Sequence, residues 1–267
     1  MKYIFDHDFH IHSRLSSCSG DPEQTPERIL QYAKDNGLKT ICLTDHYWDE
    51  EVPGGATGFY EPQNTAHIKQ SLPLPQTEGI EFLFGCETDM DKNGVIGLSK
   101  EKMNNFDFIV IPTTHLHMQD LTIDQENCYP EYIAKAWVNR FDMLLNADLP
   151  FHKVGVAHLA CKLIYRDDIE TYVRILDMIP EEDMVRLFSK AAELGVGIEI
   201  NKDDFNFEDK YEESILRMFK IAKRCGCKFY MGSDAHTSVG LGMAKELLEK
   251  GINLLELTED DKFYIKK

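Results

Sequence analysis

The sequence lacks the features that mark several large classes of protein. No apolar run approaches the ~20 residues that span a bilayer. The first ten residues, MKYIFDHDFH, carry acids and histidines where a signal peptide needs an apolar core. The seven cysteines are scattered and form no C-x-x-C pair, which argues against a disulfide framework or a structural zinc finger. We therefore expect a cytoplasmic protein that does not associate with membranes.

Basic side chains are scarce relative to acidic ones. The chain has 29 lysines and arginines against 46 aspartates and glutamates, a net charge of −17. Such a surface repels phosphate backbones, so we do not expect stable nucleic-acid binding. An acidic enzyme can still take an anionic substrate if cations within the site reverse the local field.

The 267 residues contain no repeat, low-complexity tract or flexible linker, so we expect a single domain over 1–267. Short apolar runs alternate with helical patterns, which predicts a parallel sheet, and a barrel is its closed form at this length. The predicted strands lie near 3–12, 39–45, 81–87, 106–111, 154–158, 196–200 and 228–233. The predicted helices lie near 26–37, 131–146, 181–194, 211–225 and 240–250. The first helix opens with Thr25-Pro26 and closes at Gly37.

The stretch 47–80 is irregular and rich in glycine and proline. We predict a long loop with a short helix around 64–71. It is either a surface excursion or a segment at the mouth of the site. Tyr47 and Trp48, at its start, could cover a substrate or pack within the loop.

Side chains of metal-binding types follow every predicted strand. In chain order they are His10 and His12, Asp45 and His46, Glu87, His115 and His117, His158, Glu199 and Asn201, and Asp234 and His236. The carboxyl ends of barrel strands gather at one mouth, where active sites are built. Six of these histidines, all but His117, lie directly at predicted strand ends, and they are hard to explain as packing groups because each buried imidazole needs polar partners. The pattern predicts a multinuclear metal site.

Taken together, the fragments DFHIHS, LTDH, GCETD, AH, EIN and GSDAH resemble the PHP (polymerase and histidinol phosphatase) family. They occur in the family order over nearly the whole chain, and the length is similar to that of stand-alone, histidinol-phosphatase-like members. The resemblance implies an α/β fold, a distorted TIM-like barrel of seven β/α units. It also implies a metal-dependent phosphoesterase with two or three divalent Mn, Fe or Zn ions.

The resemblance also implies roles for individual residues. His10, His12, Glu87 and Asp234 would hold one metal, and Glu87 would bridge to a second held by His115 and His158. His46 and His236 would hold a third. Where many relatives have a further histidine for that third site, this chain has Cys18, and either Cys18 or Asp21 could serve, or neither. Asp8 and Asp45 are expected to orient imidazoles rather than bind metal. Glu199 is either a pocket wall or a polar residue paired inside the barrel.

The expected reaction is hydrolysis of a small phosphorylated metabolite, a monoester such as histidinol phosphate, by a metal-activated water. Asp234 would accept a hydrogen bond from that water, and His236 or a second water would protonate the leaving alkoxide. No G-x-S-x-G elbow or Walker phosphate loop is present. Residues that could contact substrate are Arg14, His117, Lys162 and Arg166, although each could equally be a solvated surface group.

Two other functions remain open at this stage. The chain could be a nucleotide or oligonucleotide phosphodiesterase or exonuclease, which the acidic surface disfavours. It could also be a metal-binding scaffold that has lost turnover, against which the presence of Glu87 and Asp234 argues.

Overall fold

The strands of the protein form two parallel sheets surrounded by helices. The computed structural model describes residues 1–55 and 58–266. The first sheet contains β1 (His7–Ile11), β2 (Thr40–Leu43) and β3 (Glu81–Phe84), in that order. The second contains β4 (Cys86–Glu87), β5 (Ile109–Pro112), β6 (Val154–Ala157), β7 (Gly197–Asn201) and β8 (Lys228–Gly232). All neighbouring strands run parallel, which confirms the predicted α/β class.

The chain passes from one sheet to the other at Gly85. The sequence predicts one strand over 81–87, whereas the structure has β3 and β4 on either side of this glycine. A Cβ at Gly85 would lie 2.5 Å from the Phe108 carbonyl oxygen and 2.7 Å from the Cys42 sulfur. Only glycine permits this close approach of neighbouring strands. The break turns the following residues, including Glu87, toward the end of the barrel.

The opposite side of the distorted barrel is the junction between β1 and β8, which belong to different sheets. Two backbone bonds join their carboxyl ends, from Asp234 N to His10 O (2.7 Å) and from His12 N to Ala235 O (3.2 Å). Along the strands, side chains of β1 replace the missing ladder. Met231 N donates to His7 Nε2 (3.1 Å), and Ser233 N donates to Asp8 Oδ1 (3.0 Å). The predicted role of Asp8 in orienting an imidazole is therefore wrong, because its carboxylate joins the two sheets.

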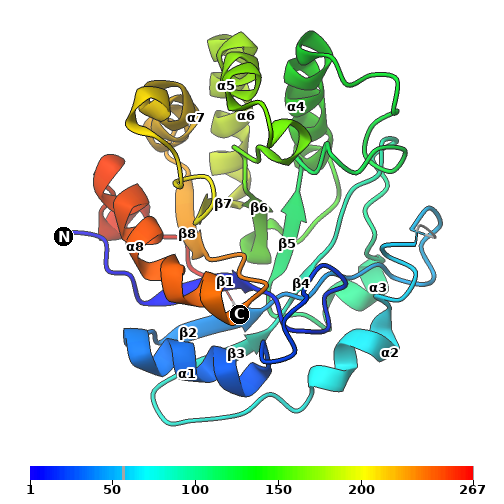
Figure 1. Ribbon diagram of the computed structural model, residues 1–267, viewed down its shortest axis with the longest axis vertical. Coiled ribbons are helices and arrows are strands. Elements are labelled where there is room, and N and C mark those ends of the chain that lie inside the picture. The colour runs from blue at the N-terminus through cyan, green and yellow to red at the C-terminus, as the bar shows by residue number, and fades with distance from the viewer. Residues whose placement is uncertain (56–57, 267) are drawn as a thin grey trace.

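Helices cover the outside of the strands (Figure 1). They are α1 (Pro26–Asn36), α2 (Thr65–Ile68), α3 (Lys100–Met103), α4 (Pro130–Leu145), α5 (Ile169–Met178), α6 (Glu181–Leu194), α7 (Glu212–Arg224) and α8 (Ser238–Leu254). As predicted, Thr25 caps α1 by accepting from Arg28 N, and Gly37 ends it at φ 67°. Helices α3 and α5 lie outside the predicted ranges, although Asp168 caps α5 and Pro180 follows it.

The hydrophobic core has an inner part and an outer part. Inside the barrel a compact cluster contains Phe9, Cys42, Leu83, Phe108, Val110, Ala157, Tyr230 and Phe263. A larger cluster lies between the strands and the surrounding helices. The inner cluster stops short of the carboxyl ends of the strands, where polar side chains lie instead. In the described part of the chain, no helix has the length and apolar character needed to cross a membrane.

Candidate metal centre

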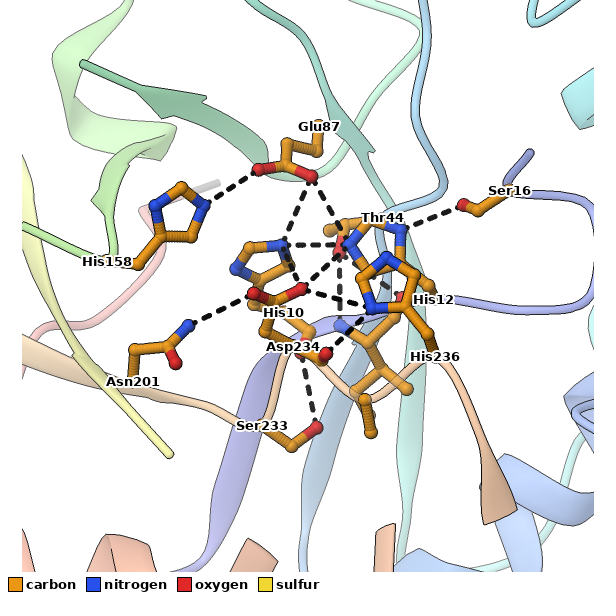
Figure 2. Close-up of polar contacts among 12 residues, drawn as sticks. His10, His12, Ser16, Thr44, Glu87, His158, Asn201, Ser233, Asp234 and His236 are labelled. Carbon is orange, nitrogen blue, oxygen red and sulfur yellow. Dashed lines mark hydrogen bonds and ion pairs between the residues drawn. The ribbon is translucent and has the colours of Figure 1, made fainter. Parts of the chain in front are cut away.

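The residues that follow the strands converge at the carboxyl end of the barrel (Figure 2). His10 lies in the last part of β1 and His12 follows the strand, and their Nε2 atoms lie 3.0 Å apart. Asp234, in the turn after β8, places Oδ1 3.6 Å from His10 Nε2 and 3.3 Å from His12 Nε2. These three side chains form the first group whose ligand atoms could hold one metal ion.

The second group contains Glu87, His115 and His158. Glu87 Oε1 lies 3.2 Å from His158 Nε2 and 3.8 Å from His115 Nε2. The other carboxylate oxygen faces the first group, with Oε2 3.5 Å from His10 Nε2 and 3.3 Å from His12 Nε2. Figure 2 shows Glu87 between His158 on one side and His10, His12 and His236 on the other. Glu87 therefore has the geometry of a carboxylate that joins two groups.

The third group contains His12, His46 and His236. The rings of His12 and His236 stack with their centroids 4.0 Å apart, and His46 Nδ1 lies 2.9 Å from Glu87 Oε2. His236 Nε2 is a buried atom with no hydrogen-bond partner among the described residues, and His46 Nδ1 faces Glu87 Oε2 without the geometry of a hydrogen bond. An unpartnered lone pair inside a protein is costly unless it binds something, and a metal ion would satisfy both atoms.

The tautomers of the imidazoles fit metal binding. The Nδ1 atoms of five histidines face acceptors: Glu199 Oε1 for His10 (2.6 Å), Ser16 Oγ for His12 (2.8 Å), Asp89 Oδ2 for His115 (2.9 Å), Thr114 Oγ1 for His158 (3.2 Å) and the Asp234 carbonyl for His236 (2.9 Å). With the proton on Nδ1, each Nε2 presents its lone pair to the centre. The nitrogen and carboxylate donors suit Zn, Mn or Fe.

The protonation of the acids also fits a cationic ligand. Burial alone would raise the pKa of Glu87, but His46 and His10 hold it well below its usual range. Asp234 keeps 18% of its side chain exposed; desolvation would raise its pKa, but His10 and His12 hold it well below the usual range. Burial lowers the pKa of His46 and lowers that of His236 to about 3. At neutral pH the two carboxylates are therefore ionised, and His46 and His236 are neutral. Burial alone would lower the pKa of His10, His12 and His158, but the surrounding carboxylates raise it, so a metal would have to displace the protons that these imidazoles hold.

Glu199, on β7, fixes the position of His10. Its Oε1 accepts from His10 Nδ1, and its Oε2 accepts from the backbone N of His158 (2.6 Å) and from Asn201 Nδ2 (3.1 Å). A Cβ at Gly232 would lie 1.8 Å from Glu199 Oε1, so the glycine of the GSDAH fragment makes room for this carboxylate. Glu199 thus lies behind the metal ligands and is not a wall of the cavity.

Replacing Glu199 with glutamine should weaken metal binding by roughly 10–100-fold, as expected for a partner that orients a ligand. The amide can also turn its NH2 toward His10, which would favour the wrong tautomer. Competition with a fluorescent chelator measures the affinity directly. The exposed Glu193→Gln, on α6, is the matched control. An unchanged affinity in Glu199→Gln would show that His10 is oriented by other contacts.

A serine connects Asp45 to His12. Ser16 Oγ accepts from His12 Nδ1 and donates to Asp45 Oδ1 (2.8 Å), whose carboxylate also accepts from Ser13 N and Ser13 Oγ (both 2.7 Å). Asp45 therefore orients the His12 imidazole through Ser16, in agreement with its predicted orienting role. Sequence reasoning missed Ser16, because a serine in a loop carries no recognisable signal.

Asp89 plays the corresponding part for His115. Its Oδ2 accepts from His115 Nδ1 and from the hydroxyl of Tyr60 (2.5 Å). Asp89 is fully buried, and His115 and Tyr60 hold its pKa below the usual value against the effect of burial. Sequence reasoning missed this aspartate although it lies within the quoted GCETD fragment. Its position two residues after Glu87 was the available signal.

A cavity of about 520 Å³ opens over the centre. Glu87, Asp234, His46, His115, His117 and His236 line it on the metal side, and Cys18, Phe59, Met118, Gln119, Leu121 and Leu163 complete it. Phe59 comes from the 47–80 stretch, so part of that stretch lies at the mouth. Tyr47 and Trp48 are buried and pack within the loop instead.

The structure brings one of the predicted substrate contacts to the cavity and leaves three outside it. His117 is exposed at the rim of the cavity, with its ring 5.2 Å from that of His115, and partial desolvation together with His115 lowers its pKa. Arg14 is exposed, Lys162 donates to the Asn206 carbonyl beside a different cavity, and Arg166 is exposed near Asp167. No lysine or arginine is among the described residues that line the cavity.

Cys18 and Asp21 lie close to the third group but are not part of it. Cys18 is exposed and lines the cavity, and partial desolvation together with Glu87 and Asp234 raises the pKa of its thiol. Asp21 Oδ2 accepts from Ser238 N (2.9 Å) and Ser238 Oγ (2.8 Å) at the start of α8. Asp21 is therefore engaged in holding that helix.

Cys18→Ser should leave the metal content per chain unchanged and alter metal affinity by far less than the roughly 10–100-fold expected for a supporting residue. The reason is that none of the three candidate ligand groups in the described chain includes Cys18. Elemental analysis of the purified variant beside the parent protein tests this. Loss of one ion per chain would make Cys18 a ligand of the third site.

Comparison with known proteins agrees with this geometry. The chain matches the PHP domain over residues 8–264. It is 30% identical to a probable phosphatase of Thermoanaerobacter sp. strain X514 over 263 residues, covering 97% of this chain and 89% of the relative. It is 26% identical to a probable phosphatase of Caldicellulosiruptor saccharolyticus, covering 87% and 83%. The chain therefore belongs to the PHP family.

Solved structures of similar fold include two histidinol phosphatases. The Lactococcus lactis histidinol phosphate phosphatase, complexed with zinc, L-histidinol and phosphate, has a TM-score of 0.58 at 21% identity and covers 92% of this chain and 93% of its own. The putative histidinol phosphatase of Listeria monocytogenes has a TM-score of 0.60 at 14% identity, covering 88% and 97%. These likenesses confirm the predicted fold.

Proposed function

We propose that the protein is a metal-dependent phosphatase that hydrolyses a small phosphate monoester with water as the nucleophile. One observation carries the proposal: three groups of buried ligands converge in a cavity whose described lining has no lysine or arginine. The lining carboxylates would repel a phosphate dianion. Two or three divalent Mn, Fe or Zn ions would reverse the charge and make phosphate the natural ligand. The phosphatase names of the relatives and the zinc and phosphate in the L. lactis structure support this reading.

The ligands would divide as the three groups do. His10, His12 and Asp234 would hold one ion, Glu87, His115 and His158 a second, and His46 and His236, with His12 beside them, a third. Such ions lower the pKa of a water and neutralise charge on phosphate oxygens. Glu87 would bridge the first two ions through its two oxygens.

Asp234 and His236 would have different roles: Asp234 would accept a hydrogen bond from water, whereas His236 would act as a ligand. Asp234 is 18% exposed at its side chain, so its carboxylate can accept a hydrogen bond from a water in the cavity. His236 directs Nδ1 to the Asp234 carbonyl and leaves Nε2 as a lone pair. An imidazole in this tautomer has no proton to give from Nε2, so the geometry favours His236 as a ligand over His236 as the acid for the leaving alkoxide.

The test is phosphate release by the metal-loaded protein from a panel of monoesters and from bis-(4-nitrophenyl) phosphate. Release from monoesters alone supports the proposal. Release from the diester with none from monoesters would make the protein a phosphodiesterase. Stoichiometric metal with no release from either would make it a metal-binding scaffold. Histidinol phosphate belongs in the panel, and a cytoplasmic location remains a prediction from the sequence.

A further inference from the structure

We infer that the substrate's alcohol part is uncharged and presents an apolar or aromatic face. This inference rests on the proposed function and concerns the half of the cavity that the metal ligands leave free. Its basis is the chemistry of the cavity walls and the positions of the charged side chains that do not line them.

One wall of the free half is apolar and held in place by packing. Phe59, Met118 and Leu121 line it. Leu121 packs with Trp48 and Tyr60 in a small cluster, and Phe59 and Met118 lie against the same cluster. The Phe59 ring also meets the His46 ring edge-on, with centroids 5.1 Å apart. An apolar wall that touches a metal-ligand side chain lies where the carbon skeleton of a bound ester must pass.

Leu163 lines the cavity from the loop that follows β6. Leu163 lies in a short 3₁₀ helix and is 44% exposed. A single exposed leucine means little by itself. Here it belongs to the same cavity as Phe59, Met118 and Leu121, so an apolar alcohol would contact apolar side chains from three loops.

Among the described residues that line the cavity, every charged side chain belongs to the candidate metal groups. Glu87 and Asp234 are the only carboxylates among the described lining residues, and both belong to the metal groups. Asp89 and Glu199 face His115 and His10, Asp45 faces Ser13 and Ser16, and Asp21 faces Ser238. Among the described lining residues, a substrate ammonium would therefore find no free carboxylate, and a substrate carboxylate would find no lysine or arginine.

A charged group placed in this half of the cavity would lose water without gaining a partner, which is unfavourable for either sign. The polar atoms that remain belong to His117, Gln119 and Cys18, which can serve a neutral hydroxyl or a ring nitrogen. The volume of about 520 Å³ is within the usual range for a metabolite site. L-Histidinol, bound by the L. lactis structure, carries an ammonium group at neutral pH. This chain would handle such an ester poorly.

The experiment compares three phosphate monoesters that share one arylethyl skeleton and carry a neutral, a cationic or an anionic ring. They are 2-phenylethyl phosphate and its ring analogues with a 4-aminomethyl or a 4-carboxyl group, assayed with the metal-loaded protein beside histidinol phosphate. The leaving alcohols have nearly the same acidity, so kcat/KM reports the alcohol pocket. We expect the neutral ester to exceed both charged analogues and histidinol phosphate by at least ~10-fold.

A pair of variants at Leu163 tests the cause. Leu163→Glu adds one carboxylate to the wall, and Leu163→Gln has the same size without the charge. The glutamate should shift the ratio of the aminomethyl ester to the neutral ester by roughly fivefold, as one ion pair near the surface can. The glutamine should keep the parent order of preference.

The outcomes separate the two proposals. Turnover with histidinol phosphate or a charged analogue as the best substrate overturns this inference and leaves the proposed phosphatase function standing. Equal shifts in the two Leu163 variants also overturn it, since the effect would not be one of charge. No release from any monoester overturns the proposed function itself.

Discussion

Replacing Glu87 with glutamine is expected to remove metal and phosphatase activity together. The carboxylate lies between the ligand groups, with Oε1 3.2 Å from His158 Nε2 and Oε2 2.9 Å from His46 Nδ1. Glutamine keeps the shape but loses the charge, and its NH2 would point at one set of imidazole lone pairs. Loss of several kcal/mol of stabilisation corresponds to a fall in kcat/KM of at least ~1000-fold. Elemental analysis should show at least one ion fewer per chain.

The matched control for this variant is Glu78→Gln. Glu78 is exposed and precedes β3, so the same chemical change there should leave metal content and kcat/KM as in the parent. Circular dichroism and thermal melting of both variants separate loss of the site from loss of the fold. Full metal content and activity in Glu87→Gln would show that Glu87 does not bridge the ions.

The ligand positions could be predicted from the sequence because the parallel strands bring their carboxyl ends to one place. Once a strand is recognised, the residues after it must lie at the same mouth as those after every other strand. His10, Glu87, His158 and Asp234 come from strands far apart in the chain, yet they converge as predicted. Strand order and side-chain type were sufficient for this part.

The residues behind the ligands could not be predicted in the same way. Ser16 and Asp89 act through bonds that depend on how loops turn, and loop direction follows from tertiary packing. Arg140 could not be predicted for the same reason. Its place on α4 resembles a surface position, but the side chain is buried. Its guanidinium donates to the carbonyls of Met90, Asp91, Thr113 and Thr122. It thereby fixes the loops after β4 and β5. The prediction for Lys162 and Arg166 was wrong because the loop that carries them directs both side chains away from the cavity.

Removing the metal should abolish activity and lower the melting temperature, and both should recover when Zn or Mn is restored. The folded chain alone holds the ligand atoms of each group within 4.8 Å of one another. A ligand that binds the folded state alone stabilises it by about 4 kcal/mol at 1000 times its Kd. For a domain of this size that corresponds to a shift of roughly 8–16 °C per site.

The metal-dependent rise in melting temperature should itself depend on pH. Burial alone would lower the pKa of His10, but Glu199, Asp234 and Glu87 raise it well above its usual value, so His10 is protonated in the metal-free protein. A raised pKa stabilises the metal-free fold at low pH, and that stability is lost as pH rises through the folded pKa. Metal must displace this proton, so its stabilising effect should shrink as pH falls from about 8 to about 6. Differential scanning fluorimetry with and without metal, at matched ionic strength, measures the difference. A shift that is constant over this range would mean that the ions bind without His10.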